Sequence, residues 1–196
     1  MHPLELVSHI FLWIAVIVLG ALVLALARQI GLLYEKTGIS GARIMNVGPS
    51  IGQAIPEFDA TDIQGKKVSL GSERGKRTLM LFISANCASC AHLMPAITKL
   101  AREERKNLDV IIAAFGINQE DGKRYSIEHR LNEVIPLIVS NDLALEYKIS
   151  VVPYGLLIDR SGILRTKGLV NHYQDIESLL NADELGVRSI QEYLKV

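Results

Sequence analysis

The first thirty residues contain an unbroken run of apolar side chains. Residues 10–27 read IFLWIAVIVLGALVLALA and include no charged residue. With Val7 and Ser8 the run reaches about 20 residues, the length that a helix needs to cross a bilayer. No polar face repeats every three or four residues, which argues against a helix buried in a globular domain. The pattern predicts a tail over 1–9 and a transmembrane anchor over 10–27.

A cleaved signal peptide is the competing interpretation of this run. Residues 25–27 read ALA, the small-x-small form that precedes a cleavage site. The run is long for a signal peptide and no Lys or Arg precedes it, which favours an uncleaved anchor. Arg28, Lys36 and Arg43 follow the run, and the positive-inside rule alone would place the next domain in the cytoplasm. Long domains cross membranes largely regardless of charge, so charge leaves the orientation open.

Beyond residue 50, short apolar runs alternate with amphipathic segments. Continuous apolar runs predict central strands buried on both faces, over 78–84 and 109–116. Shorter runs predict further strands over 136–140, 151–159 and 163–169. Helical patterns lie at 88–106, 120–131, 142–149 and 173–194, the last with a break near Gly186. A Gln64-Gly65 turn within 56–70 predicts an additional N-terminal hairpin.

This alternation of strands and helices predicts the fold class. A closing hairpin and helix after the alternating part indicate an α/β domain over 51–196, with a mixed sheet flanked by helices. Residues 28–50 are rich in glycine and show no sustained hydrophobic period, which predicts a linker. Their composition is also compatible with an extension of the anchor helix into this segment.

Composition narrows the classes of partner. Hydrophobic residues make up 49% of the chain, enough for a sizeable core. Lys plus Arg and Asp plus Glu both total 21, so the formal net charge is zero. A basic surface for nucleic acid is therefore not indicated, and no nucleic-acid partner is expected.

The only two cysteines are Cys87 and Cys90, in the sequence CASC. They fall where a predicted buried strand ends and a predicted helix begins. Three-residue spacing across the first turn allows the sulfurs to bond, and the unpaired N–H groups there favour a thiolate at Cys87. Since the thiolate is the attacking species in disulfide exchange, Cys87 is the predicted nucleophile and Cys90 the resolving thiol.

Two less reactive interpretations of the pair compete with this one. Structural zinc needs four ligands, the chain has no second cysteine pair, and His92 would be a third ligand only if another chain supplied the rest. A purely structural disulfide that closes so small a loop would stabilise little. We therefore expect no metal and no cofactor.

Val152-Pro153 opens the predicted strand over 151–159, some sixty residues after the cysteines. Taken alone, Pro153 would be an ordinary edge-strand proline. Its combination with the cysteine pair and with Ile158-Asp159-x-x-Gly162 favours a functional role.

These motifs together carry a family resemblance. Residues 51–170 resemble the thioredoxin-like superfamily, in particular its membrane-tethered branch, and more closely the MauD family of methylamine utilisation proteins. The matching segments are NVGPSIGQAIPEF (46–58), LFISANCASCAHLMPAI (81–97), SVVPYGLLIDRSGILRTKGLVN (150–171) and the ending from Gly186-Val187 to Tyr193-Leu194.

The resemblance implies a site and a biological setting. A cis Pro153 would face the disulfide and leave the backbone of Val152 free to pair with an extended substrate segment. The implied protein crosses the inner membrane once, with its catalytic domain in the periplasm. It would form or isomerise disulfides during maturation of the methylamine dehydrogenase small subunit, together with a redox partner that the sequence does not identify.

Departures from thioredoxin bear on the redox direction. Asn86 stands in place of the tryptophan before the first cysteine, neither residue between the cysteines is proline, and Leu81 replaces a buried acid. Without that acid the resolving thiol lacks a proton acceptor, which favours an oxidase or isomerase over a fast reductase.

Three other functions compete. A reductase of the cytochrome c assembly type and a tethered assembly chaperone remain open. A peroxiredoxin-like peroxidase would use Ser84, but Met80 occupies that family's proline position.

Overall fold

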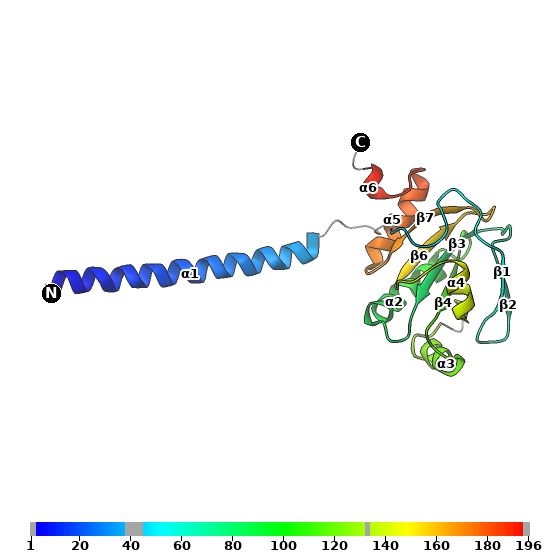
Figure 1. Ribbon diagram of the computed structural model, residues 1–196, viewed down its shortest axis with the longest axis horizontal. Helices are drawn as coiled ribbons and strands as arrows, with labels where there is room; N and C mark the ends of the chain where they lie inside the picture. Colours follow the sequence, from blue (N-terminus) through cyan, green and yellow to red (C-terminus); the bar gives the residue numbers. More distant parts are fainter. Residues whose placement is uncertain (1–2, 38–44, 132–133, 194–196) are drawn as a thin grey trace. The chain divides into compact units, whose positions relative to one another are not determined.

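The computed structural model describes residues 3–37, 45–131 and 134–193 (Figure 1). Its contacts divide the chain into two compact units, Met1–Ser40 and Gly41–Val196. Part of the predicted linker (38–44, with Arg43) and Leu194 of the matching C-terminal segment lie outside the described residues.

The described part of the first unit is one helix, α1 (Pro3–Thr37). It continues past the predicted anchor on both sides, so residues 28–37 of the predicted linker are helical. The large apolar side chains described between Ile10 and Leu24 are more than half exposed, at 53–75%. Over the residues that the structure describes, no helix combines the length and apolarity of a membrane span. The anchor over 10–27 stays a prediction.

A five-stranded mixed sheet forms the centre of the second unit. In chain order the strands are β3 (Arg77–Ile83), β4 (Leu108–Ala114), β5 (Leu137–Val139), β6 (Tyr154–Ile158) and β7 (Leu164–Leu169). Their spatial order is β5-β4-β3-β6-β7. β3, β4 and β5 are parallel, β6 is antiparallel to β3, and β7 is antiparallel to β6. The predicted mixed sheet is confirmed.

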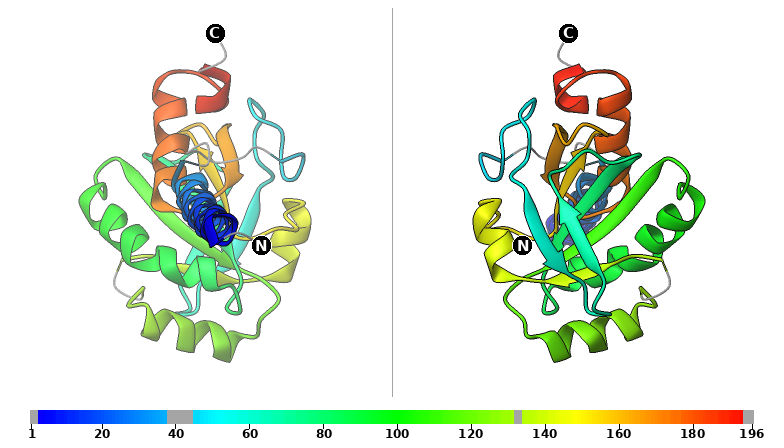
Figure 2. Two further views of the ribbon diagram at one scale, coloured as in Figure 1. Left: turned by 90° about the vertical axis from the view of Figure 1, so that its left-hand side faces the viewer. Right: turned by 90° about the vertical axis from the view of Figure 1, so that its right-hand side faces the viewer.

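Both faces of this sheet are covered, because its central strands are apolar on both sides (Figure 2). Leu79, Leu81 and Ile83 of β3 face one core cluster, while Met80 and Phe82 face the other. The first cluster includes side chains of α2 (Ala88–Glu103), α3 (Gln119–Glu128) and α5 (Tyr173–Glu184). The second includes side chains of α4 (Asn141–Glu146) and of the hairpin of β1 (Phe58–Thr61) and β2 (Lys67–Leu70). A short α6 (Ile190–Tyr193) follows α5, with the predicted break between them.

Residues 45–55 lie along the outer edge of the sheet, although part of this stretch was predicted to be linker. The Gly52 N–H donates to the Leu164 carbonyl (2.8 Å), and the Leu164 N–H donates to the Gln53 carbonyl (2.9 Å). Edge strand β7 is thereby covered, which protects it from pairing with other chains. The ammonium of buried Lys167 donates to the carbonyls of Val47 (2.8 Å) and Pro49 (2.7 Å), and burial lowers the pKa of Lys167.

Candidate active site

Cys87 begins helix α2 and is bonded to Cys90. Its backbone is extended (φ −95°, ψ 104°), as expected of an N-cap residue, and the Cys90 N–H donates to the Cys87 Sγ across 3.2 Å. The two residues form a disulfide, with their Cα atoms 5.2 Å apart. The sulfur of Cys87 therefore sits where the first turn of the helix presents unpaired N–H groups.

The two sulfurs differ in access to solvent. Cys90 is 0% exposed and belongs to the core cluster, whereas Cys87 is half-buried and packs at the border of that cluster. A large substrate can reach only the Cys87 side of the bond. The roles of Cys87 as nucleophile and Cys90 as resolving thiol stay predictions, which this asymmetry supports.

Helix α2 holds no acidic residue in its first turn, unlike α3, α4 and α5. Those three helices carry Glu120 and Asp121, Asp142, and Asp175 respectively in their first turns. A carboxylate at that place would satisfy the positive end of the helix and repel a neighbouring anion. In α2 no carboxylate occupies this place, so the Cys87 sulfur is the group that interacts with the positive end of the helix.

Core packing fixes α2 and hence the position of Cys87. Leu93, Met94, Ile97 and Leu100 are buried on the side of the helix that faces the sheet. Pro95 lies inside the helix, on its exposed side. Because a proline has no N–H, the helix loses one internal hydrogen bond there.

The Val152–Pro153 peptide bond is cis, and it lies beside the cysteine pair in the fold. The antiparallel register of β3 with β6 pairs Phe82 with Tyr154. Pro153, the residue before Tyr154, therefore lies beside the end of β3 that leads to Cys87. Val152 and Cys87 pack against the same core cluster. Among the described residues, the backbone N–H and carbonyl of Val152 have no hydrogen-bond partner.

Three segments at this edge of the sheet carry no charged side chain. Because β3 and β4 are parallel and β6 runs opposite, the segments that follow β3 and β4 and the segment that precedes β6 lie at the Cys87 edge: 84–91, 115–118 and 150–153. Their sequences contain no Asp, Glu, Lys or Arg. Phe115 and Ile117 in the second segment are half-buried and were not singled out in the sequence. Both residues directly follow a strand that is parallel to β3, and this position in the sequence could have identified them.

His92 and Ser89 take no part in the observed contacts of the cysteine pair. Both side chains are exposed on α2, and within the described part of the chain neither has a hydrogen bond or ion pair. Over the same residues, no group of three or more His, Cys, Asp or Glu side chains is placed to hold a metal ion. Leu81 is 1% exposed within the core cluster, so an apolar side chain occupies the position of thioredoxin's buried acid.

Sequence comparison relates the chain to redox proteins. The profile of the AhpC/TSA family matches residues 51–167. Methylamine utilization protein MauD of Paracoccus versutus is 37% identical over 95% of this chain and 93% of its own length. MauD of Methylorubrum extorquens is 36% identical over 95% of this chain and 90% of its own length. Thioredoxin-like protein YneN of Bacillus subtilis is 26% identical over 61% of this chain and 71% of its own length.

Comparison with solved structures bears on the fold. The thioredoxin domain of a thiol-disulfide oxidoreductase from Bacteroides vulgatus superposes with a TM-score of 0.55 at 24% identity, covering 66% of this chain and 96% of that chain. A thiol:disulfide interchange protein from Bacteroides sp. gives a TM-score of 0.56 at 24% identity, over 67% of this chain and 91% of that chain. The domain has the thioredoxin-like fold.

Proposed function

The chain belongs to the MauD family of methylamine utilisation proteins and is a thiol–disulfide oxidoreductase, and from this premise we propose that it forms or isomerises disulfides in a periplasmic client protein. The observation that carries the proposal is the asymmetric cysteine pair: Cys87 is half-buried at the start of α2, and Cys90 is fully buried behind it.

Disulfide formation proceeds by two exchanges at Cys87. A client thiolate attacks the Cys87 Sγ, which forms a client–Cys87 bond, breaks the Cys87–Cys90 bond and releases Cys90 as a thiolate. A second client thiolate then attacks the client sulfur of this mixed disulfide and releases Cys87. The client loses two electrons and two protons, and the cysteine pair gains them. A redox partner that accepts the two electrons must restore the pair.

Isomerisation starts instead from the reduced pair. The Cys87 thiolate attacks a client disulfide, forms a mixed disulfide and releases a client thiolate, which attacks a different client disulfide. A client thiolate finally attacks the client sulfur bonded to Cys87, which closes the rearranged client disulfide and restores the Cys87 thiolate. When rearrangement stalls, Cys90 attacks Cys87 instead, which oxidises the cysteine pair and leaves the client reduced. In both reactions, disulfide formation and isomerisation, the unpaired backbone of Val152 supplies a hydrogen-bond donor and an acceptor for an extended client segment beside Cys87.

We place the protein in the inner membrane with the disulfide domain in the periplasm, and we take the methylamine dehydrogenase small subunit as its client. The exposed apolar side chains of α1 between residues 10 and 24 support an anchor over 10–27. A periplasmic position suits the chemistry, because disulfides persist in oxidising compartments. The client follows from the family alone.

A Cys90→Ser variant tests the proposal, because it leaves Cys87 able to attack but removes the thiol that resolves the adduct. We expect a stable mixed disulfide between Cys87 and the small subunit, visible on non-reducing gels and identified by mass spectrometry. The matched control is the double variant Cys87→Ser with Cys90→Ser, which should capture nothing.

Two results would contradict the proposal. One is the absence of any thiol-reversible adduct in the Cys90→Ser variant. The other is unchanged small-subunit maturation in cells that carry only the double variant, which would indicate a non-catalytic assembly role.

A further inference from the structure

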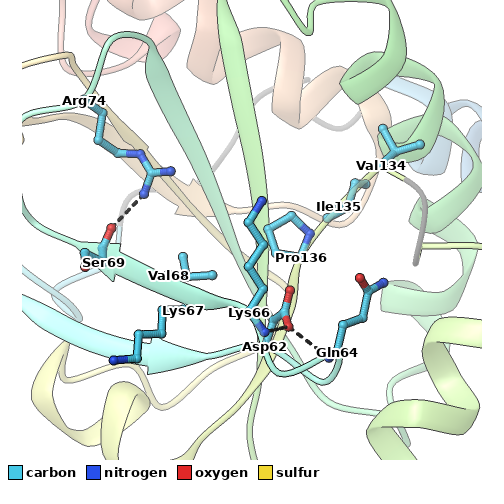
Figure 3. A pocket seen from close by; sticks show the side chains of 10 residues that line it. All are labelled: Asp62, Gln64, Lys66, Lys67, Val68, Ser69, Arg74, Val134, Ile135 and Pro136. Atoms are coloured by element: carbon cyan, nitrogen blue, oxygen red, sulfur yellow. Dashed lines mark hydrogen bonds between the residues drawn. The ribbon is translucent and has the colours of Figure 1, made fainter.

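A basic groove lies at the edge of the sheet opposite Cys87. This groove, which we define by Lys66, Lys67 and Arg74, has a volume of about 320 Å³ (Figure 3). Pro136 also lines it, directly before β5, and Arg74 lies shortly before β3, so the groove adjoins the starts of these parallel strands. Cys87 follows the end of β3. At the usual rise per residue, the seven residues of β3 separate the two places by roughly 20 Å.

Two of the three basic side chains of the groove point into one hollow, whereas Lys67 points away from it. In Figure 3, Lys66 and Arg74 point into it from two sides, above Val68 and Pro136. The Arg74 guanidinium donates to the Ser69 carbonyl (2.7 Å). The ammonium groups of Lys66 and Lys67 make no hydrogen bond or ion pair with any other residue that the structure describes.

Positive charge continues into the adjoining cavity of about 520 Å³, which shares Lys66 and Arg74 with the groove. Lys76 and Arg105 also line this cavity, and Asp109 is the sole carboxylate among its lining residues as described. Asp109 lies 3.7 Å from Arg74 and 3.3 Å from Lys76. The positive potential is therefore local, since the whole chain has no formal net charge.

Asp62 is the carboxylate that lines the groove itself, and its hydrogen bonds are made within the β1–β2 hairpin. It is 6% exposed, and its Oδ1 accepts hydrogen bonds from the backbone N–H groups of Gln64 (2.9 Å) and Lys66 (2.8 Å). It stabilises the turn between β1 and β2 and leaves the ammonium groups at the mouth of the groove for an incoming anion.

An unpaired strand edge borders these cations. The Asp62 N–H donates to the Lys66 carbonyl, which makes 62 and 66 a hydrogen-bonded pair of the β1–β2 ladder. Since antiparallel ladders alternate, the backbone groups of Lys67 and Ser69 point away from β1. Arg74 takes the Ser69 carbonyl on that side. Among the described residues, the N–H groups of Lys67 and Ser69 and the Lys67 carbonyl have no partner.

We propose that the basic groove binds an extended acidic segment of a partner protein, which adds as a strand to the free edge of β2. The free N–H and carbonyl groups of β2 fit a peptide main chain, and alternate side chains of an added strand would reach the cations or the apolar floor. The chemistry selects Glu or Asp residues alternating with apolar ones.

This binding surface is separate from the redox site. A segment of about six extended residues spans the distance between groove and Cys87. A partner held by its acidic segment would present its cysteines to Cys87 at raised effective concentration.

The test uses the full-length protein and the fluorescein-labelled peptide Glu-Val-Glu-Val-Glu. We expect saturable binding by fluorescence anisotropy, no binding of Lys-Val-Lys-Val-Lys, and shifts of the Lys67 and Ser69 amide resonances in NMR spectra. Lys66→Glu should weaken binding by about tenfold or more, since it replaces an attractive charge by a repulsive one. The matched control is Lys123→Glu, the same charge change at an exposed residue of α3 that lines neither cavity.

Four outcomes would overturn the proposal: no saturable binding, equal weakening by the two variants, binding without movement of the Lys67 and Ser69 amides, or binding of phosphatidylglycerol vesicles in place of the peptide. Exchange with oxidised dithiothreitol, an uncharged small disulfide, should be unchanged in Lys66→Glu. Failure here would thus be distinguished from failure of the redox function.

Discussion

Replacing Cys87 by serine is expected to lower the rate of thiol–disulfide exchange by about three orders of magnitude or more, because a serine hydroxyl stays protonated at neutral pH and forms no disulfide. The folded domain should survive, since serine is a favourable N-cap residue and Cys87 caps α2. The measurement is the rate of exchange with a client-derived peptide disulfide, alongside the circular dichroism spectrum.

Ser89→Ala provides the matched control, because Ser89 is exposed on the same helical turn. It should exchange at a rate within about twofold of the unchanged protein, as a solvent-facing substitution that removes no structural contact. If Cys87→Ser retained a tenth of the activity, the proposed nucleophile would be wrong.

Replacing Ile97 by alanine is expected to destabilise the domain by about 2–5 kcal/mol, since Ile97 is a core residue and truncation leaves a cavity. Ile97 is 0% exposed in the core cluster that also contains Cys90, on the face of α2 that lies against the sheet. With an m-value of about 2 kcal/mol per molar, the midpoint of urea unfolding should shift down by roughly 1–2.5 M.

Lys99→Ala is the control for this change, because Lys99 is exposed on the same helix, where its ammonium pairs, among the residues that the structure describes, with Glu103 alone. Its effect should stay within about 0.5 kcal/mol. A loss below about 1 kcal/mol for Ile97→Ala would show that α2 is not held by this packing. The folded fraction of Ile97→Ala should still exchange disulfides, because Cys87 and Cys90 are unchanged.

The sheet was predictable because burial on both faces leaves a strong signal. The apolar runs that predicted strands at 78–84 and 109–116 correspond to β3 and β4 within one or two residues. The helix predicted to 106 ends at Glu103, where the Glu104 N–H donates to the Leu100 carbonyl and closes the last turn. Helix ends depend on such local bonds, which periodicity does not report.

The strand predicted from Val151 begins only at Tyr154. Pro153 has no N–H to give to a ladder, and the backbone of Val152 finds no partner among the described residues, so the apolar run starts before the pairing does. The hydrophobic pattern reports which residues are buried, and at this place the apolar segment is longer than the part that pairs with neighbouring strands.

Contacts between residues far apart in the chain could not be predicted from the sequence. The ammonium of Lys167 donates to the carbonyls of residues 47 and 49, and these hydrogen bonds attach part of the predicted linker to β7. A lysine inside a strand pattern gave no sign of burial. The cysteine pair was found from the sequence because its signal is local: two cysteines in one helical turn after a buried strand.

The central claim is that Cys87 reacts as an anion stabilised by the start of α2, with Cys90 shielded behind it. The most direct test follows alkylation of the reduced protein by iodoacetamide between pH 5 and 9, with mass spectrometry to assign the modified cysteine. The account predicts that Cys87 is modified first and that its rate is already near its plateau at about pH 7, as for a thiolate. A rate that climbs about tenfold per pH unit up to pH 8, equal at both cysteines, would contradict it.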